Sequence, residues 1–431
     1  MDRYVEYKNG TDLLPRIPTS WTVKPLKYAA ALNLRVLLEN TNEEAEINYI
    51  DIGSVEYGKG IVNIQEYTFA NAPSRARRIV YEGDTIISTV RTYLKAVAYI
   101  SKDYDGFVCS TGFAVFTPKA EIDRKFFSYA LLDFGFISDV ERHSVGVSYP
   151  AITSSVLASL KAVFPPSEEQ AAIATYLDRR TAGIDDLLAD LTRQAEMLDT
   201  YKRELVAEAV SKGLDKSVAM RDSGVDWIGG IPAHWKTRRI KYLYELRQER
   251  NFLPLADVEL ISLYTNLGVV KHSDLEKTTG NKAQNADGYK HVYKNDIVVN
   301  IILCWMGAIG LSDYNGVTSP AYDVYKPKVD MVCSKYYHYL FRTSKFCGEC
   351  FKVGRGIMMM RWRTYSDQFK AITVQLPPIA EQERIATYLD TKTAQVESLI
   401  ADIKAQIEKL KQYRQIVIHD AVTGNIKVTE G

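Results

Sequence analysis

The residues that most suggest site chemistry are two cysteines three positions apart, Cys347 and Cys350. A structural zinc site would need two further ligands at a workable spacing, and the nearest candidates are Cys333 and His338. Both lie on a stretch that we expect to be helical. We therefore interpret Cys347 and Cys350 as two thiols on one partly buried helix face, with a zinc site as the alternative, and predict no metal ligand in this chain.

Motifs of nucleotide-dependent and metal-dependent enzymes are missing from the sequence. It contains no Gly-x-x-x-x-Gly-Lys-Ser/Thr phosphate loop, no His-Glu-x-x-His zinc motif and no Asn/Asp-Pro-Pro-Tyr/Phe motif of an adenine methyltransferase. Gly58-Lys-Gly60 and Gly354-Arg-Gly356 lack the rest of a dinucleotide fingerprint. These absences predict a chain without catalytic residues and without a cofactor of its own.

Basic side chains gather in two stretches that contain no acid, residues 67–81 and 350–363, although the net charge is only +1. Local positive faces of this kind suit nucleic acid, because arginine and lysine bind phosphates and arginine also pairs with guanine. A solvated loop is the simpler interpretation of any single cluster. The candidate DNA contacts are Arg75, Arg77, Arg78, Arg91, Lys95 and Arg142 in the first half, and Lys282, Lys290, Arg355, Arg361 and Arg363 in the second.

Such contacts need a frame to position them, and the sequence contains one twice. Residues 174–178, Ala-Thr-Tyr-Leu-Asp, return unchanged at 386–390, and Ile17-Pro18 and Trp21 return as Ile231-Pro232 and Trp235. We expect the two tryptophans to be core anchors. Between the anchors the halves hardly resemble each other. A shared frame with two different inserts is typical of a protein that binds two different targets with one geometry.

The inserts show a mixed pattern. Enrichment in β-branched residues predicts strands at 84–90, 113–116, 296–300 and 321–325, and apolar spacing predicts helices at 125–136 and 336–346. Ser167 followed by Gln170 predicts a capping box, which Ile379 removes from the second copy. We expect a helix break around residues 178–183 and a longer helix after it.

Each half ends in a heptad pattern, and a long helix over residues 181–211 would span about 45 Å. One cation interrupts each seam, which can fix register and partner choice, or can reach out to solvent from an ordinary bundle helix. We expect the two helices to pack antiparallel and to hold two globular parts at a set distance. The seams are Ile184, Leu188, Leu191, Ala195, Leu198, Lys202, Leu205 and Ala209, and Val396, Ile400, Ile403, Ile407, Leu410, Arg414, Val417 and Ala421.

With these features the chain resembles the specificity subunits of type I restriction-modification systems over nearly its whole length. The resemblance is carried by residues 222–235, 376–390 and 296–310 together with Ser319-Pro-Ala-Tyr322. It implies an α+β fold in which two pseudo-symmetric target recognition domains of mixed α/β structure are joined by two long antiparallel coiled-coil helices. The implied parts are a first recognition domain (1–166), a central helical spacer (167–213), a second recognition domain (214–378), a distal helical spacer (379–424) and a tail (425–431).

The resemblance also implies the partners. Each recognition domain would read one half of a split double-stranded DNA site, and the helical seams would dock the modification subunits, of which we expect two. Those subunits would bind S-adenosylmethionine and methylate adenine, and motor-nuclease subunits would use ATP and Mg²⁺. The chain itself would perform no chemistry.

Three alternatives remain open: a specificity subunit of a methylation-only or phase-variable system, a self-contained methyltransferase-nuclease, and a coiled-coil scaffold without a DNA role. The five cysteines form no disulfide framework, and we find no secretory signal and no run of about 18 apolar residues. We therefore expect a cytoplasmic protein without a membrane partner.

Overall fold

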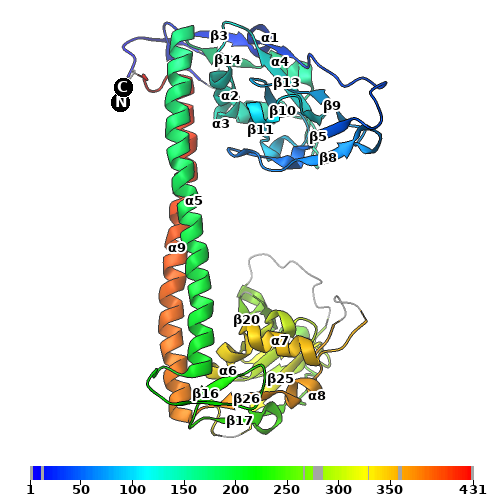
Figure 1. The fold of residues 1–431 in the computed structure, drawn as a ribbon, viewed down its shortest axis with the longest axis vertical. Coiled ribbons are helices and arrows are strands. Elements are labelled where there is room, and N and C mark those ends of the chain that lie inside the picture. The colour runs from blue at the N-terminus through cyan, green and yellow to red at the C-terminus, as the bar shows by residue number, and fades with distance from the viewer. Residues whose placement is uncertain are drawn as a thin grey trace. The chain divides into compact units, whose positions relative to one another are not determined.

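The structure is a computed structural model that describes residues 3–10, 14–265, 267–274, 285–328, 330–357 and 362–428 (Figure 1). The chain forms two compact units, unit 1 (residues 1–192 and 404–431) and unit 2 (residues 193–403). Two long helices, α5 (Ser167–Lys212) and α9 (Ile379–Thr423), each contribute one part to either unit. Each unit therefore contains the beginning of one long helix and the end of the other.

Unit 1 contains two four-stranded sheets. The inner sheet is antiparallel in the order β11-β10-β13-β4, and the outer sheet has the order β8-β5-β12-β9, with β5 and β12 parallel. Its helices are α1 (Leu26–Ala29), α2 (Arg124–Leu132), α3 (Phe134–Arg142) and α4 (Ser154–Ser159). Its strands are β1 (Tyr7–Asn9), β2 (Arg16–Pro18), β3 (Thr22–Pro25), β4 (Ala30–Leu32), β5 (Glu46–Ile50), β6 (Val55–Glu56), β7 (Gly60–Ile61), β8 (Gln65–Thr68), β9 (Ala76–Ile79), β10 (Thr85–Ser88), β11 (Val97–Tyr99), β12 (Val108–Ser110), β13 (Phe113–Pro118) and β14 (Lys161–Phe164).

Unit 2 repeats this plan. Its inner sheet is antiparallel in the order β18-β25-β22-β23, and the pairs β19-β20 and β21-β24 stand where unit 1 has its outer sheet. Its helices are α6 (Ser334–Phe341), α7 (Ser344–Val353) and α8 (Ser366–Ala371). Its strands are β15 (Met220–Asp222), β16 (Gly230–Pro232), β17 (Lys236–Arg239), β18 (Tyr244–Leu246), β19 (Ile261–Tyr264), β20 (Gly268–Lys271), β21 (Lys290–Val292), β22 (Ile297–Asn300), β23 (Ile309–Leu311), β24 (Gly316–Thr318), β25 (Tyr322–Pro327) and β26 (Thr373–Leu376).

The core of each unit lies where the inner sheet, the short helices and the long helices meet. In unit 1, Trp21, Phe126 and Phe127 are fully buried and share a cluster with Leu177 of α5 and Val422 of α9. In unit 2, the corresponding cluster of buried side chains contains Trp235, Tyr336, Phe341, Leu389 of α9 and Val210 of α5. Trp21 and Trp235 are 0% and 1% exposed, so the prediction that both are core anchors is confirmed.

The long helices pack in opposite directions within each unit. In unit 1, Arg414 near the end of α9 pairs with Asp185 near the start of α5 through two hydrogen bonds of 2.8 and 3.1 Å. In unit 2, Nζ of Lys202 near the end of α5 lies 3.3 Å from Glu397 near the start of α9. The two seam cations therefore form ion pairs between α5 and α9, and the expected antiparallel packing is confirmed in both units.

The same polar contacts fasten each domain to the long helices. The indole nitrogen of Trp21 donates to Glu169 of α5 over 3.2 Å, and that of Trp235 donates to Glu381 of α9 over 3.0 Å. Further along, Asp178 accepts hydrogen bonds from Lys125 and Tyr129 of α2, and Asp390 accepts hydrogen bonds from Lys335 and Tyr339 of α6.

The predicted capping box at Ser167 is wrong, because Gln170 is used elsewhere. Its side-chain oxygen accepts from the backbone N–H of Asp123, and its amide nitrogen donates to the carbonyl of Pro165, both over 2.9 Å. Gln382 repeats this clamp, accepting from the N–H of Cys333 over 2.9 Å. A buried amide with tertiary partners satisfies backbone groups that would otherwise be unpaired, so these glutamines belong to the domain–helix contact.

The predicted strands correspond to β10, β13, β22 and β25. The helix predicted at 125–136 is two helices, because Asp133 ends α2 and caps α3, and the helix predicted at 336–346 is likewise divided before Thr343, which caps α7. The expected break at 178–183 does not occur. Leu177, Thr181 and Ile184 are buried on one face of α5, and this packing keeps the helix continuous past Gly183.

Candidate nucleic-acid interface

Arg75, directly before β9, and Arg77 and Arg78 within it differ in how exposed their side chains are. Arg75 is exposed, whereas Arg77 stacks on Phe69 at 5.1 Å and donates to the carbonyl of Ala76. Arg78 is half-buried, burial lowers its pKa, and one of its guanidinium nitrogens has no partner in the described part of the chain. Arg75 is therefore the side chain of this group that is placed to contact a phosphate.

The other three candidates of unit 1 share one surface around α3 and the 3₁₀ turn η3 (Thr92–Leu94), which pack together. Arg91 and Arg142 are exposed. Nζ of Lys95 lies 3.8 Å from Glu141 at the end of α3. The structure thus brings Arg91, Lys95 and Arg142 to one patch. These residues lie in other parts of the sequence than Arg75, Arg77 and Arg78.

In unit 2 the prediction for Lys290 is wrong as a surface contact. Lys290 is 7% exposed, and its ammonium donates to Asp323 over 2.8 Å, so it is held in a buried ion pair. Lys282 and Arg361 lie outside the described residues. Arg355 and Arg363 are exposed and face each other across an antiparallel bridge, with backbone hydrogen bonds of 2.9 and 3.0 Å.

Two arginines that the sequence did not single out form a matched polar site in the inserts. Arg35 pairs with Asp84 over 2.9 Å and stacks on Tyr81, and Arg247 pairs with Asp296 through two hydrogen bonds of 2.8 and 2.9 Å. Arg247 also stacks on Tyr293, and in both units the backbone N–H of the tyrosine donates to the same carboxylate. The sequence did contain a signal for this matched site. In both halves a Tyr-x-x-Asp segment follows an arginine at the same spacing.

The seam residues line the facing sides of α5 and α9. All sixteen are buried or half-buried, whereas the intervening Leu187, Met197, Leu399 and Ile416 are exposed apolar side chains on the same helices. Apolar side chains left exposed on a helix pair provide area for a further protein contact. The docking of a partner on these helices stays a prediction.

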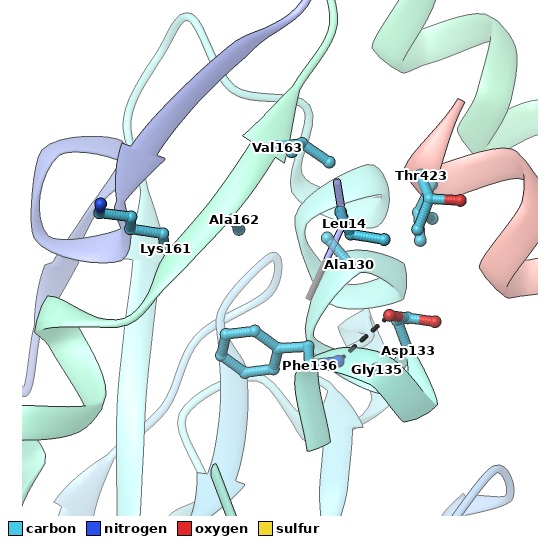
Figure 2. Close-up of a pocket in the computed structure, with 10 residues that line it drawn as sticks. Leu14, Ala130, Asp133, Gly135, Phe136, Lys161, Ala162, Val163 and Thr423 are labelled. Carbon is cyan, nitrogen blue, oxygen red and sulfur yellow. Dashed lines mark hydrogen bonds between the residues drawn. The ribbon is translucent and has the colours of Figure 1, made fainter. Parts of the chain in front are cut away.

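Each unit contains cavities, and the larger ones in unit 1 have volumes of about 520 and 280 Å³. Figure 2 shows a pocket of unit 1 lined by Leu14, Ala130, Asp133 and Thr423, with Asp133 accepting from the N–H of Phe136; its volume is about 30 Å³, room for little more than a water molecule. In unit 2 an open groove of about 1080 Å³ separates α5 from α7, lined by Arg203, Leu267, Met306 and Phe351 among others.

Among the described residues no three His, Cys, Asp or Glu side chains come together as a metal site. Cys350 is buried, and His338 uses its Nδ1 to accept from the backbone N–H of Leu311 over 3.1 Å. Burial lowers the pKa of His338 to about 4, so this imidazole is neutral. No helix in the described ranges is both long and apolar enough to cross a membrane.

The family model "Type I restriction modification DNA specificity domain" matches the chain twice, at residues 27–197 and 232–409. The chain belongs to this family. Curated relatives include the Escherichia coli type I restriction enzyme EcoBI specificity subunit, 23% identical over 328 residues that cover 70% of this chain and 66% of the relative. A putative type I restriction enzyme MjaX specificity subunit of Methanocaldococcus jannaschii is 25% identical over 293 residues, covering 65% of this chain and 63% of the relative. The matched regions span less than two thirds of these relatives' lengths.

Solved structures share the fold over almost the full chain. A chain from a study of complex assembly and conformational transition of the type I R-M system has a TM-score of 0.72 at 19% identity, covering 95% of this chain and 99% of that one. The HsdS subunit of Thermoanaerobacter tengcongensis has a TM-score of 0.53 at 21% identity, covering 95% of this chain and 98% of that one. Two recognition domains on two long antiparallel helices are thus the fold of this chain.

Proposed function

We propose that this protein is the DNA-recognition subunit of a type I restriction-modification enzyme. In this proposal each unit reads one half of a split double-stranded DNA site, and the paired helices dock two modification subunits. Those subunits supply S-adenosylmethionine-dependent adenine methylation, and motor-nuclease subunits supply ATP- and Mg²⁺-dependent cleavage. The family match to both halves supports a recognition subunit that leaves the chemistry to its partners.

The single observation that carries the proposal is the duplicated attachment of two dissimilar domains. Trp–Glu, Gln–backbone and Lys/Tyr–Asp contacts recur in both units, while the loops and outer strands that they carry differ. One attachment geometry with two surfaces is what a reader of two different half-sites needs. A scaffold without a DNA role would not require the exposed basic residues Arg75, Arg91, Arg355 and Arg363 on those surfaces.

Adenine methylation mapping tests the proposal directly. Cells that express this chain with its modification subunits should carry methyl groups at one two-part sequence. Exchange of residues 1–166 for those of a related subunit should change one half-site and leave the other intact. Alteration of both half-sites would contradict independent reading, and binding that shows no two-part preference would contradict the DNA-recognition role.

The helices are expected to set the gap between the half-sites. Four residues inserted in frame into both α5 and α9 add about 6 Å along each axis, with about 40° of extra rotation. At about 3.4 Å per base pair the mapped site should widen by about two base pairs. An unchanged gap in the methylation map would count against a spacer role for the helices.

A further inference from the structure

An antiparallel bridge follows α3 in unit 1 and α7 in unit 2. In unit 1, Val145 pairs with Ala151, and the bridge is held to η3 by a hydrogen bond of 2.9 Å between Thr92 and Ser144. In unit 2, Arg355 pairs with Arg363. The residue after each bridge is held next to the inner sheet in the same way, because the N–H of Ile152 donates to the carbonyl of Thr89 and that of Thr364 donates to the carbonyl of Ile301.

One arginine at or close to each bridge stacks on a tyrosine. The guanidinium carbon of Arg91 lies 5.3 Å from the ring centre of Tyr149, and that of Arg355 lies 4.9 Å from the ring centre of Tyr365. Stacking on an aromatic face immobilises the guanidinium and leaves its in-plane N–H groups available. Close by, each unit has a fully exposed aliphatic side chain, Val147 in unit 1 and Ile357 in unit 2.

These two arginines differ from Arg35 and Arg247, which also stack on tyrosines. Arg35 and Arg247 direct their N–H groups at buried carboxylates, which satisfies them within the fold. Within the described residues no carboxylate pairs with Arg91 or Arg355. Arg35 and Arg247 therefore use the stacked geometry within the fold, whereas Arg91 and Arg355 use it with the guanidinium edge open to a ligand.

The backbone at Arg91 is strained, whereas the backbone at the equivalent position of unit 2 is not. Arg91 has φ 53° and Lys95 has φ 53°, both in the left-handed region. The equivalent positions of unit 2 are Leu303, with φ −114°, and Gly307, a residue for which the left-handed region is open. A non-glycine side chain is sterically unfavourable in that region. Backbone strain of this kind at an exposed turn is typical of a binding site.

We propose that Arg91 and Arg355 are the guanine-reading side chains of their units, each presenting a preorganised guanidinium fork to O6 and N7 of a guanine in the major groove. Bidentate arginine–guanine contacts require this planar geometry. An aliphatic side chain beside the guanidinium suits base edges, where thymine offers a methyl group, better than it suits phosphates. The inference rests on the proposed function and adds the base that each half-site must contain.

The test uses the complete complex of this chain with its modification subunits and DNA carrying the mapped site. Single 7-deazaguanine substitutions remove N7 from one guanine at a time. One substitution in the first half-site should weaken binding roughly 5- to 100-fold for the native chain, and Arg91→Ala should abolish that sensitivity. Arg355→Ala should do the same for one guanine of the second half-site only.

Two further variants separate base reading from charge and from misfolding. Arg91→Lys keeps the charge but not the fork, so it should lose discrimination against altered guanine while the salt dependence of binding stays the same. Arg142→Ala, at an exposed and unstacked arginine of the same patch, should weaken binding to all sequences and lower the salt slope by about one.

The proposal is overturned if a mapped half-site contains no guanine on either strand, or if Arg91→Ala weakens all sequences equally and lowers the salt slope. It is also overturned if Arg91→Lys, folded by circular dichroism, retains full discrimination. These outcomes leave two-part DNA recognition intact. Failure of the native complex to prefer any two-part sequence would instead reject the proposed function.

Discussion

In both units the same kinds of contact attach the domain to the long helices. The units differ at one junction, where α3 meets the end of α9 in unit 1 and α7 meets the end of α5 in unit 2. In unit 1, Nδ1 of His419 on α9 lies 2.8 Å from Asp133, the cap of α3, and the imidazole stacks on Phe134 at 4.3 Å. In unit 2, Ala207 of α5 and Thr343 stand at the equivalent positions, and both line the open groove. The contacts that attach each domain to the long helices are therefore the same in both units, whereas the contacts at this junction differ.

A second difference lies on the outer strands of the inserts. Arg78 of β9 and Lys290 of β21 occupy equivalent positions, but Lys290 has a buried carboxylate partner, whereas no carboxylate of the described residues pairs with Arg78. Equivalent cations thus have different energetic roles, because Asp323 of β25 provides the pair in unit 2 while Ala114 stands at its counterpart in unit 1. The comparison teaches that the inserts keep their topology while their interior polar contacts change.

The largest expected effect comes from breaking that pair. Lys290→Met leaves Asp323 as an unpaired buried charge and should lower the free energy of unfolding by about 3–5 kcal/mol, whereas Arg78→Met should change it by less than about 1 kcal/mol. Urea unfolding of the full chain measures both, with hydrogen exchange to assign the loss to unit 2. Asp323→Asn added to Lys290→Met should recover part of the loss. Equal losses for Lys290→Met and Arg78→Met would remove the distinction between the units.

The His419–Asp133 contact should give this junction of unit 1 a pH dependence that the equivalent junction of unit 2, at Ala207 and Thr343, lacks. Burial lowers the pKa of His419, but the hydrogen bond and charge of Asp133 outweigh burial and raise it overall. Since the folded pKa lies above the unfolded value of about 6.5, the stabilisation is complete below that pH and is lost as the pH rises through the folded value.

His419→Gln should therefore lower the free energy of unfolding by roughly 1–2 kcal/mol at pH 5.5, and by less at pH 9. Thermal unfolding at the two pH values measures the difference. Ala207→Gln, at the equivalent position on α5, is the matched control and should show no such pH dependence. A deficit that grew with pH would contradict a protonated His419.

The smallest effects are expected at the left-handed turn. Lys95→Gly relieves backbone strain and should change stability by no more than about 1 kcal/mol, with a gain from the backbone set against the loss of the Glu141 contact. Gly307→Ala has room for the new methyl group, 3.7 Å from the Cys347 sulfur, but its φ of 86° should still cost about 1 kcal/mol. Chemical denaturation of both variants measures these changes in the free energy of unfolding. A clear loss in Lys95→Gly would give Lys95 a structural role.

The frame was predictable from sequence because its contacts recur at fixed spacing along the chain. The repeated 174–178 segment, the tryptophans and the heptad seams each determine a packing surface locally, and Lys202 and Arg414 lie on the seams as their heptad positions indicate. Gln170 was misassigned because its partners are tertiary. The N–H of Asp123, 47 residues away, uses the side chain that a local pattern assigns to a cap.

The candidate site was less predictable, since burial decides whether a basic residue can reach DNA. Nothing near Lys290 in the sequence indicates that Asp323, 33 residues later, will bury it in an ion pair. The stacking of Arg91 on Tyr149 and of Arg355 on Tyr365 could likewise not be predicted, because each pair of side chains is brought together only by the folded backbone. The repeated topology of the inserts was hidden by loops of different length, which shift equivalent residues out of a constant spacing.

The division of the long helices between the units has a consequence for synthesis on the ribosome. Unit 2 is one continuous segment, 193–403, whereas the core of unit 1 includes Val417, Ile418 and Val422 from the last part of the chain. At roughly 5–20 residues per second, the nascent first domain waits on the order of 10–40 s for those side chains. The domain whose first strands are synthesised earliest is therefore the one whose core is completed last.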